Sequence, residues 1–292
     1  MATSRGFMVG LVGTGVTESL SPALHMAEAS AQGFPLVFRP IDLTMLRLEA
    51  DRLPEILDWA ERLGYDAVTV THPCKQQVVG LLDTVDPVAA DLGAVNTVLL
   101  TPGGRVGYNT DTSGFEAAFR GGMPDVPLGK VVQLGAGGGG TAVADALVRL
   151  GAGQLTLVDI DENRAASLAK SLGERRNADV RSAPLSELTQ LLAAADGVVH
   201  CTPQGMHDHP GTPFDTALLR PDLWVADIVY RPLETELLKA ARAVGCQALS
   251  GGLMAVCQAA DAFRLITNAE PDRDRMMQHF RELADAEVAA PE

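Results

Sequence analysis

The sequence Val132-Gln133-Leu134-Gly135-Ala136-Gly137-Gly138-Gly139-Gly140-Thr141 contains the spacing G-x-G-x-x-G at Gly135, Gly137 and Gly140. An apolar stretch precedes it and a helical pattern follows it, so we predict a tight turn between a strand and a helix. Glycines at this spacing let the backbone approach a pyrophosphate, which then lies at the helix N-terminus. The stretch therefore predicts a dinucleotide-binding fold, with cofactor-binding residues Gly135, Gly137, Gly138, Gly139 and Gly140.

The next strand is expected to end beside Asp159, 24 residues after Gly135. A carboxylate ~20 residues after the glycine loop accepts hydrogen bonds from the ribose hydroxyls of NAD and repels the 2′-phosphate of NADP. Ile160 supplies no cation, and Arg164 either pairs with Asp161 or lies near the adenine. We therefore expect NAD, bound in part by Asp159 and Arg164. The alternative for Asp159 is a carboxylate that merely ends a strand in solvent.

Composition limits the classes of function that remain. The chain has 292 residues and a formal net charge of −14, with 47% hydrophobic residues. This length favours two domains, and the acidic balance argues against a nucleic-acid partner. The apolar stretch near the N-terminus is short for a signal peptide, and no apolar run reaches the ~18 residues of a transmembrane helix. We expect a cytoplasmic protein without membrane or nucleic-acid partners, whose four scattered cysteines are buried and bind no metal.

Short β-branched runs alternate with longer helical patterns, which predicts an α/β protein with mostly parallel sheets. Strands are expected at 7–13, 36–42, 67–71, 130–134, 155–158, 197–201 and 223–228. Helices are expected at 22–32, 44–64, 73–82, 141–150, 162–172, 234–244, 253–266 and 273–286. A stretch rich in Gly and Pro at 121–129 interrupts the pattern. We predict a substrate-binding catalytic domain at 1–115, a Rossmann domain at 116–252, and C-terminal helices at 253–292 that return to the first domain.

Polar clusters stand at the ends of three expected strands in the N-terminal half. Ser19 and Ser21 lie two residues apart, so both hydroxyls can hold a carboxylate, although Ser21 before Pro22 is also a good helix N-cap. Lys75 lies in the first turn of a short helix, where the helix dipole disfavours a cation and so assists general-base work. Asp111 follows a run of Asn and Thr and could anchor Lys75; alternatively, both are ordinary surface residues.

Taken together, these residues resemble the shikimate/quinate dehydrogenase family over nearly the whole chain. Seven motifs stand in the family's order, which makes the resemblance specific. They are S-x-S-P-x-x-H at 19–25, V-T-x-P-x-K at 70–75, G-A-V-N-T at 93–97, N-T-D-x-x-G at 109–114, the glycine loop at 135–140, Y-x-P-x-x-T at 230–235 and G-x-x-M-x-x-x-Q at 251–258.

The resemblance implies an N-terminal three-layer α/β substrate domain, a C-terminal Rossmann domain and a cleft between them. Lys75 and Asp111 would be the catalytic pair, in which Lys75 accepts the proton of a ring hydroxyl while hydride leaves for the nicotinamide. The implied substrate-binding residues are Ser19, Ser21, Thr71, Asn96, Tyr230 and Gln258. The implied cofactor-binding residues beyond those above are Thr202, Pro203, Met206, Val229, Gly252 and Met254.

Within the family, the sequence resembles the NAD-dependent quinate/shikimate dehydrogenase branch of actinobacterial type, because Asp159 replaces the N-R-T segment of NADP-using members. The implied reaction is the reversible oxidation of quinate or shikimate to the 3-dehydro ketone, in quinate metabolism or aromatic amino acid biosynthesis. The alternatives are a dehydrogenase of aminoshikimate or aminoquinate, an NADP-dependent biosynthetic shikimate dehydrogenase, and a non-catalytic NAD-binding regulator. A homodimer is a possible assembly.

Three residues depart from the usual patterns. Thr69 and His200 stand where the family usually has Asn, and Ser21 is the shikimate-like residue where quinate-preferring relatives often have Thr. His200 is expected either as a polar group near the nicotinamide or as a core histidine bonded to a backbone carbonyl. These departures leave the choice among quinate, shikimate and an aminated analogue open.

Overall fold

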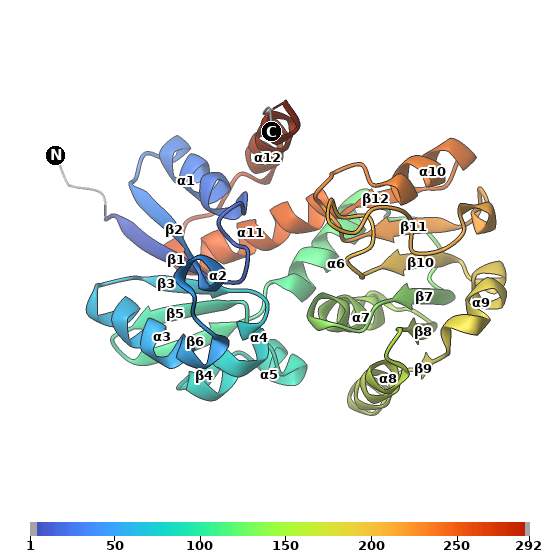
Figure 1. Cartoon of the computed structure of the whole chain (residues 1–292), viewed down its shortest axis with the longest axis horizontal. Helices are drawn as coiled ribbons and strands as arrows, with labels where there is room; N and C mark the ends of the chain where they lie inside the picture. The colour runs from blue at the N-terminus through green and yellow to red at the C-terminus, as the bar shows by residue number, and fades with distance from the viewer. Residues whose placement is uncertain (1–4, 290–292) are drawn as a thin grey trace. The chain divides into compact units, whose positions relative to one another are not determined.

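The computed structural model describes residues 5–289 and divides the chain into two compact units (Figure 1). Unit 1 extends to Thr110 and resumes at Gln258, and unit 2 comprises Asp111–Cys257. The expected boundary after residue 115 lies inside helix α6 (Asp111–Gly122), and the one after residue 252 lies inside helix α11 (Gly251–Thr267). Both boundaries between the units therefore fall at or within helices rather than in the Gly- and Pro-rich stretch.

Unit 1 contains one mixed sheet with the strand order β2-β1-β3-β5-β6-β4. Strand β1 pairs in parallel with β2 and β3, whereas β5 and β6 form an antiparallel hairpin beside β3. The alternating pattern predicted the first three strands and missed the hairpin, whose available signal was the turn at Pro102-Gly103. The strands are β1 (Phe7–Gly13), β2 (Leu36–Asp42), β3 (Ala67–Val70), β4 (Thr84–Val85), β5 (Thr97–Thr101) and β6 (Gly104–Tyr108).

Two helical layers bury the two faces of this sheet. On one face Val9 and Phe38 pack with Phe263 of α11, and on the other Val12 and Val70 pack with Leu57. The helices are α1 (Ser21–Ala31), α2 (Leu43–Leu46), α3 (Leu53–Arg62), α4 (Cys74–Gln77), α5 (Pro87–Leu92) and α12 (Arg273–Ala289), with 3-10 turns η1 (Ala50–Arg52) and η2 (Val78–Leu81).

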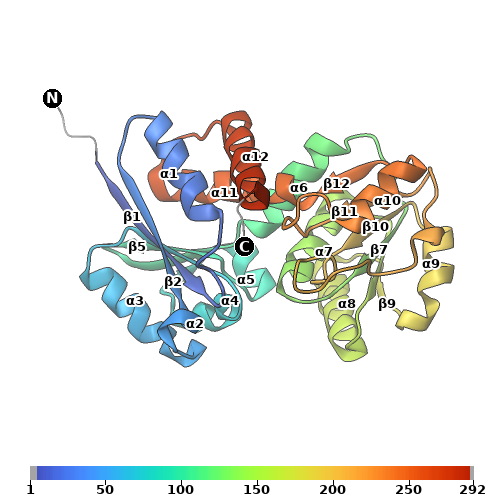
Figure 2. The ribbon, with the colours of Figure 1, turned by 45° about the horizontal axis from the view of Figure 1, so that its top comes forward.

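The C-terminal helix α12 lies against α1 (Figure 2). The buried carboxylate of Glu28 accepts hydrogen bonds from Arg275, with an Nη2–Oε1 distance of 2.6 Å, and from the backbone of Asp272. A buried charge needs such partners, so this ion pair fixes the C-terminal helix to the N-terminal one.

The single helix expected at 44–64 is wrong, because the chain forms α2, η1 and α3 instead. Arg47 adopts a left-handed conformation with φ 56° and ends α2, and Pro54 lies in the first turn of α3, where its missing N–H costs nothing. Leu46, which a single helix over 44–64 would place on the same apolar face as Leu53 and Leu57, is 53% exposed.

Unit 2 contains a wholly parallel sheet with the order β12-β11-β10-β7-β8-β9 (Figure 1). Counted from its first strand, this is the order 3-2-1-4-5-6 of dinucleotide-binding folds. The strands are β7 (Lys130–Leu134), β8 (Gln154–Val158), β9 (Val180–Ser182), β10 (Gly197–His200), β11 (Trp224–Asp227) and β12 (Ala248–Ser250). The predicted Rossmann architecture is confirmed.

Each face of this sheet has its own core. Leu147 and Leu157 belong to the core under α6, α7 (Gly138–Leu150) and α8 (Glu162–Arg176), whereas Leu134 and Leu192 belong to the core under α9 (Leu188–Ala194) and α10 (Glu236–Val244). The 3-10 turns η3 (Leu185–Glu187) and η4 (Thr216–Leu218) connect these elements. Helix α7 follows β7 and packs in the first core, whereas the segment after β10, with Phe214 and Leu219, packs in the second, so the chain leaves these neighbouring strands toward opposite faces. The carboxyl ends of these two strands are the usual ligand site of such a fold.

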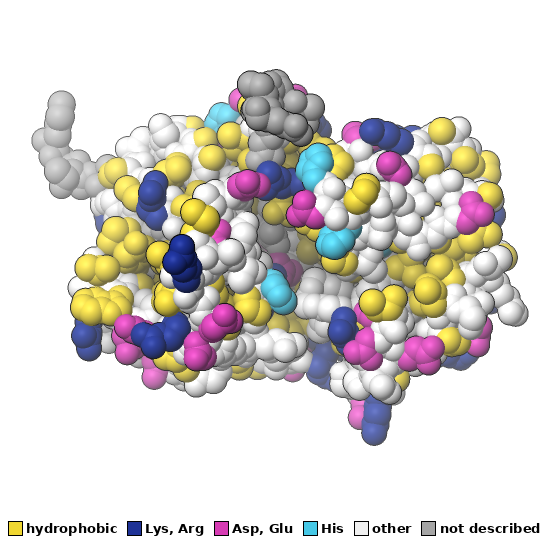
Figure 3. Space-filling view, in the orientation of Figure 1, with side chains coloured by type: hydrophobic (Ala, Val, Ile, Leu, Met, Phe, Trp, Pro, Cys, Tyr) yellow, Lys and Arg dark blue, Asp and Glu magenta, His cyan; other side chains and the backbone are white. Residues whose placement is uncertain are grey.

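The surface carries charged side chains of both signs. On the face drawn in Figure 3, basic and acidic side chains are interspersed rather than gathered into a basic patch. Among residues 5–289, no helix is long and apolar enough to cross a membrane.

Candidate functional site

The glycine loop joins β7 to α7, and its first and last glycines are required by close packing. Gly135 has φ 96°, and a Cβ there would lie 2.8 Å from the carbonyl oxygen of Cys201. A Cβ on Gly140 would overlap the carbonyl oxygen of Gly135. By contrast, no described atom lies within 4 Å of a Cβ built on Gly137 or Gly138. The loop is therefore packed at its ends and open in its middle, where a pyrophosphate would need room.

Gln133, in strand β7, holds the conformation of this loop by hydrogen bonds, a role that the sequence patterns did not predict. Its buried side-chain Nε2 donates to the carbonyl oxygens of Gly135 and Gly140, at 2.8 Å each. The two bonds tie the ends of the loop together. A glutamine in an otherwise apolar strand was the available signal, since a buried amide needs hydrogen-bond partners.

Asp159 follows β8 and is buried rather than a solvated strand end. Its Oδ2 accepts the N–H of Ala136 at 2.7 Å, and its Oδ1 accepts the N–H of Asp161 at 2.9 Å. Arg164 lies 3.8 Å from Asp159 Oδ2 and 3.5 Å from Asp161 Oδ2, so the expected pair of Arg164 with Asp161 forms. The carboxylate thus joins the glycine loop to the segment after β8, and Ile160 beside it is 91% exposed.

His200 ends β10 directly opposite Asp227, which ends β11. His200 Nδ1 lies 3.0 Å from Asp227 Oδ1, and its Nε2 lies 2.5 Å from the Thr202 hydroxyl. Asp227 also accepts the N–H of Val229 at 3.0 Å and the hydroxyl of Thr235 at 2.7 Å. His200 is wholly buried but bonds to side chains, so the expected bond to a backbone carbonyl is replaced by a side-chain network.

Two segments that the resemblance assigned to the cofactor lie over the glycine loop. A Cβ at Gly135 would be 3.1 Å from Thr202 Cγ2, and one at Gly139 would be 3.2 Å from Ile228 Cδ1, beside Val229. Pro203 and Met206 are exposed in the loop after β10, whereas Met254 is buried in α11. The Gly252 N–H bonds to Ser250 Oγ at the start of that helix. Glycine loop, Asp159 and Thr202 thus share the carboxyl edge of the sheet, which fits a dinucleotide.

In unit 1, the loop that carries Ser19 is held by Asp42. The carboxylate of Asp42 accepts hydrogen bonds from the N–H groups of Gly15 and Thr17 and from the Thr17 hydroxyl. Burial would raise the pKa of Asp42, but the hydrogen bonds from Thr17, Gly15 and Met45 outweigh it and lower that pKa to about 2. This network fixes the approach of the chain to α1.

Ser19 and Ser21 flank the start of α1. Ser19 Oγ accepts the N–H of Ser21 at 3.3 Å. The interpretation of Ser21 as an N-cap is wrong, because Leu20 occupies that position and Ser21 is the first helical residue. Its carbonyl accepts a bond from His25 Nδ1 at 2.8 Å. Burial lowers the pKa of His25 to about 4, although bonds to the Ser21 and Ala259 carbonyls oppose the shift.

Three of the family-like motifs meet within unit 1. The carbonyl of Lys75 accepts the N–H of Val95 at 2.8 Å, which joins the lysine motif to the Gly93–Thr97 motif. Asn96 Nδ2 donates to the Thr110 hydroxyl at 3.0 Å, and Asn96 Oδ1 accepts the Thr110 N–H at 3.0 Å. Thr71 packs against Gly13, where a Cβ would collide with it. Lys75 and Thr71 are half-buried, so both side chains retain access to solvent.

The other predicted site residues lie elsewhere. Gln258 is half-buried in the part of α11 that belongs to unit 1. Asp111, the buried first residue of α6, and Tyr230, which follows β11, belong to unit 2.

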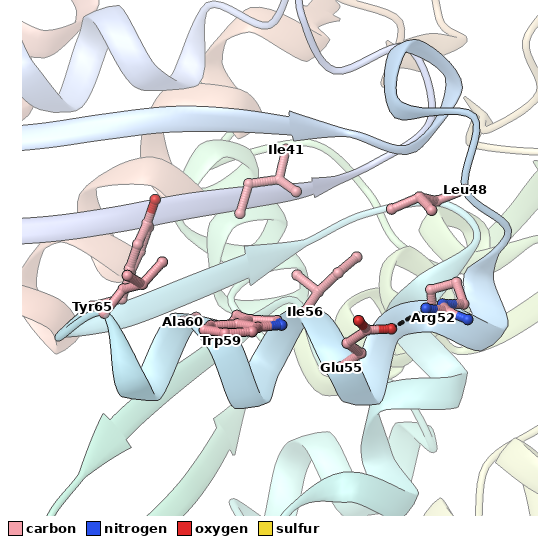
Figure 4. A pocket seen from close by; sticks show the side chains of 9 residues that line it. Ile41, Leu48, Arg52, Glu55, Ile56, Trp59, Ala60 and Tyr65 are labelled. Atoms are coloured by element: carbon pink, nitrogen blue, oxygen red, sulfur yellow. Dashed lines mark hydrogen bonds and ion pairs between the residues drawn. The ribbon is translucent and has the colours of Figure 1, made fainter.

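A hollow of about 250 Å³ opens between α3 and the sheet of unit 1 (Figure 4). Trp59, Ile56 and Tyr65 line it, and Arg52 and Glu55 form an ion pair at its rim. None of its lining residues is a predicted site residue, and apolar walls offer nothing to a polyhydroxylated acid.

The described residues contain no group of three or more His, Cys, Asp and Glu side chains able to hold a metal ion. All four cysteines are free thiols. Burial raises the pKa of the Cys74 thiol, so this neighbour of Lys75 behaves as a packed apolar side chain.

Comparisons with known proteins agree with this geometry. Residues 11–98 match the family model of the shikimate dehydrogenase substrate binding domain. The chain is 52% identical over 288 residues to a shikimate dehydrogenase (NADP(+)) of Pseudarthrobacter chlorophenolicus, covering 98% of both chains. It is 48% identical over 281 residues to a quinate/shikimate dehydrogenase (NAD(+)) of Corynebacterium glutamicum strain R, covering 94% of this chain and 98% of the relative.

Solved structures show the same relationship over both units. Quinate dehydrogenase from Corynebacterium glutamicum in complex with NAD superposes with a TM-score of 0.91 at 47% identity, covering 95% of this chain and all of that one. Shikimate 5-dehydrogenase from Thermus thermophilus in complex with NADP(H) and shikimate superposes with a TM-score of 0.83 at 33% identity, covering 95% and 99%. The protein belongs to the shikimate/quinate dehydrogenase family.

Proposed function

We propose that the protein is an NAD-dependent quinate/shikimate dehydrogenase, which reversibly oxidises a ring hydroxyl to the 3-dehydro ketone. The proposal is supported by the meeting of three motifs in unit 1. The backbone carbonyl of Lys75 accepts the N–H of Val95, and the Asn96 side chain bonds to Thr110, the residue before Asp111. A regulator without chemistry would have no need of a half-buried lysine beside the buried polar side chains of Asn96 and Thr110.

In the proposed mechanism, the Lys75 amine accepts the proton of the ring hydroxyl while the same carbon gives up hydride. Bound NAD supplies the hydride acceptor. Asp111 orients the resulting ammonium, and in the reverse direction Lys75 returns the proton to the alkoxide. The products are the ketone, the reduced cofactor and a protonated lysine, so atoms and charge balance.

The substrate would be held by hydroxyl and amide groups. Ser19, Ser21 and Tyr230 would bind the carboxylate, and Thr71, Asn96 and Gln258 would bind ring hydroxyls. Asn96 Oδ1 already accepts hydrogen bonds from the Thr97 hydroxyl and the Thr110 N–H, so the amide would act as a donor toward the ring. Quinate and shikimate both carry the required carboxylate and vicinal hydroxyls.

NAD is proposed over NADP because Asp159 places a carboxylate, and Ile160 no cation, after β8. The shikimate dehydrogenase (NADP(+)) relatives make the opposite cofactor a real alternative, with Arg164 as the nearest cation. Steady-state kinetics with NAD and NADP decide between them. A higher kcat/KM with NADP would reject the proposed role of Asp159. The Asp159→Asn variant should have kcat/KM values for NAD and NADP that differ less than those of wild type.

The reaction itself is tested by NADH absorbance with quinate, shikimate and their aminated analogues. Lys75→Ala should reduce kcat by ~100-fold or more, in the range of a lost general base, while the Kd for NAD stays unchanged. Lys130→Ala, at an exposed lysine of β7, is the control. Absence of turnover by a folded wild-type protein with every substrate and both cofactors would reject the enzyme in favour of a binding protein.

A further inference from the structure

We propose that His200 is a positioning residue, which together with Asp227 fixes the Thr202 hydroxyl as a hydrogen-bond acceptor for the nicotinamide half of the cofactor. The inference rests on the proposed dinucleotide binding. It adds that the Thr202 hydroxyl can only accept a hydrogen bond from the cofactor. It concerns the side chain at which this sequence departs from the usual family pattern.

The polarity follows from the network. Asp227 is the acceptor for Val229 and Thr235, and its Oδ1 also faces His200 Nδ1, so Nδ1 carries the ring proton. With the ring proton on Nδ1, Nε2 accepts the hydrogen bond and the Thr202 hydroxyl donates it across 2.5 Å. This assignment of the tautomer uses both neighbours of the ring, as histidine requires.

The hydroxyl has one more partner. Thr202 Oγ1 accepts the N–H of Gln204 at 3.2 Å. A hydroxyl has one proton and two lone pairs, so a single lone pair remains. Thr202 can therefore accept one further hydrogen bond and cannot donate one.

The hydroxyl that carries this remaining lone pair lies at the proposed cofactor site. Thr202 is half-buried and packs over Gly135, the first glycine of the loop. Asp227 also accepts the N–H of Val229, another residue that the resemblance assigns to the cofactor. The buried pair of His200 and Asp227 thus positions both the Thr202 segment and the Val229 segment. The cofactor group that donates to Thr202 is either the carboxamide N–H or a hydroxyl of the adjacent ribose.

Binding measurements test the proposal without relying on turnover. NADH fluorescence titrations would compare wild type, Thr202→Val, His200→Asn and the double variant, with His207→Asn as a control in the same loop. An asparagine at 200 keeps a donor for Asp227 and loses the reach to Thr202. Each single variant should weaken NADH binding ~10-fold, the size of one lost hydrogen bond in a desolvated site, and blunt the emission change of bound NADH.

The double variant is the decisive measurement. If His200 acts through Thr202, the double variant binds no worse than either single one, because the second change removes nothing more. Additive losses, or unchanged binding by folded His200→Asn, overturn the proposal. A merely structural histidine would lower the melting temperature without this coupling.

An analogue identifies the donor. The 3-acetylpyridine analogue of NAD lacks the carboxamide N–H and keeps the ribose. If wild type prefers NAD to this analogue and Thr202→Val does not, the donor is the carboxamide; an equal effect of Thr202→Val on both assigns the ribose. Wild-type binding without turnover of any substrate would reject the proposed function alone and leave these binding results to decide the role of His200.

Discussion

The side-chain nitrogen of Gln133 lies 2.8 Å from the carbonyl oxygen of Gly140 and donates a hydrogen bond to it, so a strand residue holds the last glycine of the cofactor loop. The same nitrogen bonds to Gly135. Gln133→Glu keeps the shape and places oxygens against two carbonyls. We expect it to weaken NAD binding ~10-fold or more, since a buried polar group then lacks its partner. Calorimetric titration measures this loss.

The control for Gln133 is Gln154→Glu, on the neighbouring strand β8, where the side chain is solvent-accessible and bonds to Asp179. Its NAD affinity should match that of wild type. Equal affinities of Gln133→Glu and wild type would show that the loop holds its shape without the clamp.

The glycine loop predicts opposite outcomes for two alanine substitutions. Gly140→Ala should destabilise the fold, because its Cβ would overlap the Gly135 carbonyl, whose backbone cannot move aside cheaply. Gly137→Ala should leave the melting temperature unchanged, since its Cβ meets no described atom within 4 Å, yet it should weaken NAD binding by filling the pyrophosphate's space. Thermal melts with and without NAD separate the two effects. Full NAD affinity in Gly137→Ala would place the pyrophosphate elsewhere.

Local sequence patterns predicted the parts of the site that depend on neighbours along the chain. Strands β1, β2 and β7 have the expected bounds, because each is a short apolar run between turn residues. The glycine loop and Asp159 were predicted for the same reason, because their residue types and their spacing along the chain are the features that a dinucleotide site requires. The helix α7 begins three residues earlier than expected, at Gly138, because the glycines themselves form its first turn.

Partners that come from distant segments could not be predicted. Nothing in the sequence near His200 indicates Asp227, which becomes its neighbour only when β10 and β11 align in parallel. Asp42 and the loop at 15–17 meet in the same way. The units divide at Thr110, whereas the sequence places the boundary after residue 115, because α6 starts at Asp111 with no break in composition.

The buried imidazole of His25 predicts a loss of stability in mild acid. Its pKa is lowered from 6.5 to about 4 by burial, so below pH 6.5 the unfolded chain binds a proton that the folded protein does not. The free energy of unfolding should therefore fall as the pH drops from 6.5 to 4, by an amount of order 3 kcal/mol. Above pH 7 this residue should contribute no pH dependence.

Urea unfolding of wild type and His25→Asn across this range tests the assignment. The asparagine keeps a donor toward the Ser21 carbonyl and cannot titrate, so its stability curve should be flatter between pH 6.5 and 4. His207→Asn, at an exposed histidine, should keep the wild-type slope. Identical slopes for wild type and His25→Asn would assign the acid sensitivity to other groups.

Asp42 connects the fold of unit 1 to the proposed substrate-binding serines, because it holds the loop that leads to Ser19. Asp42→Asn removes the charge that accepts bonds from Thr17 and Gly15. We expect a loss of about 2 kcal/mol in stability, since hydrogen bonds to a charged group are the strong ones. We also expect a higher KM for quinate or shikimate with an unchanged KM for NAD, because only the substrate side depends on this loop.

The pH dependence gives Asp42 a second, independent signature. Its folded pKa of about 2 lies below the ordinary aspartate value of 3.8, so its contribution to stability is complete above pH 4 and is lost as the pH falls toward 2. The stability difference between wild type and Asp42→Asn should shrink over that interval, whereas the exposed control Asp51→Asn should show no difference at any pH. A rise of both KM values together in Asp42→Asn would mean that the loop acts on the whole fold and not on the serines alone.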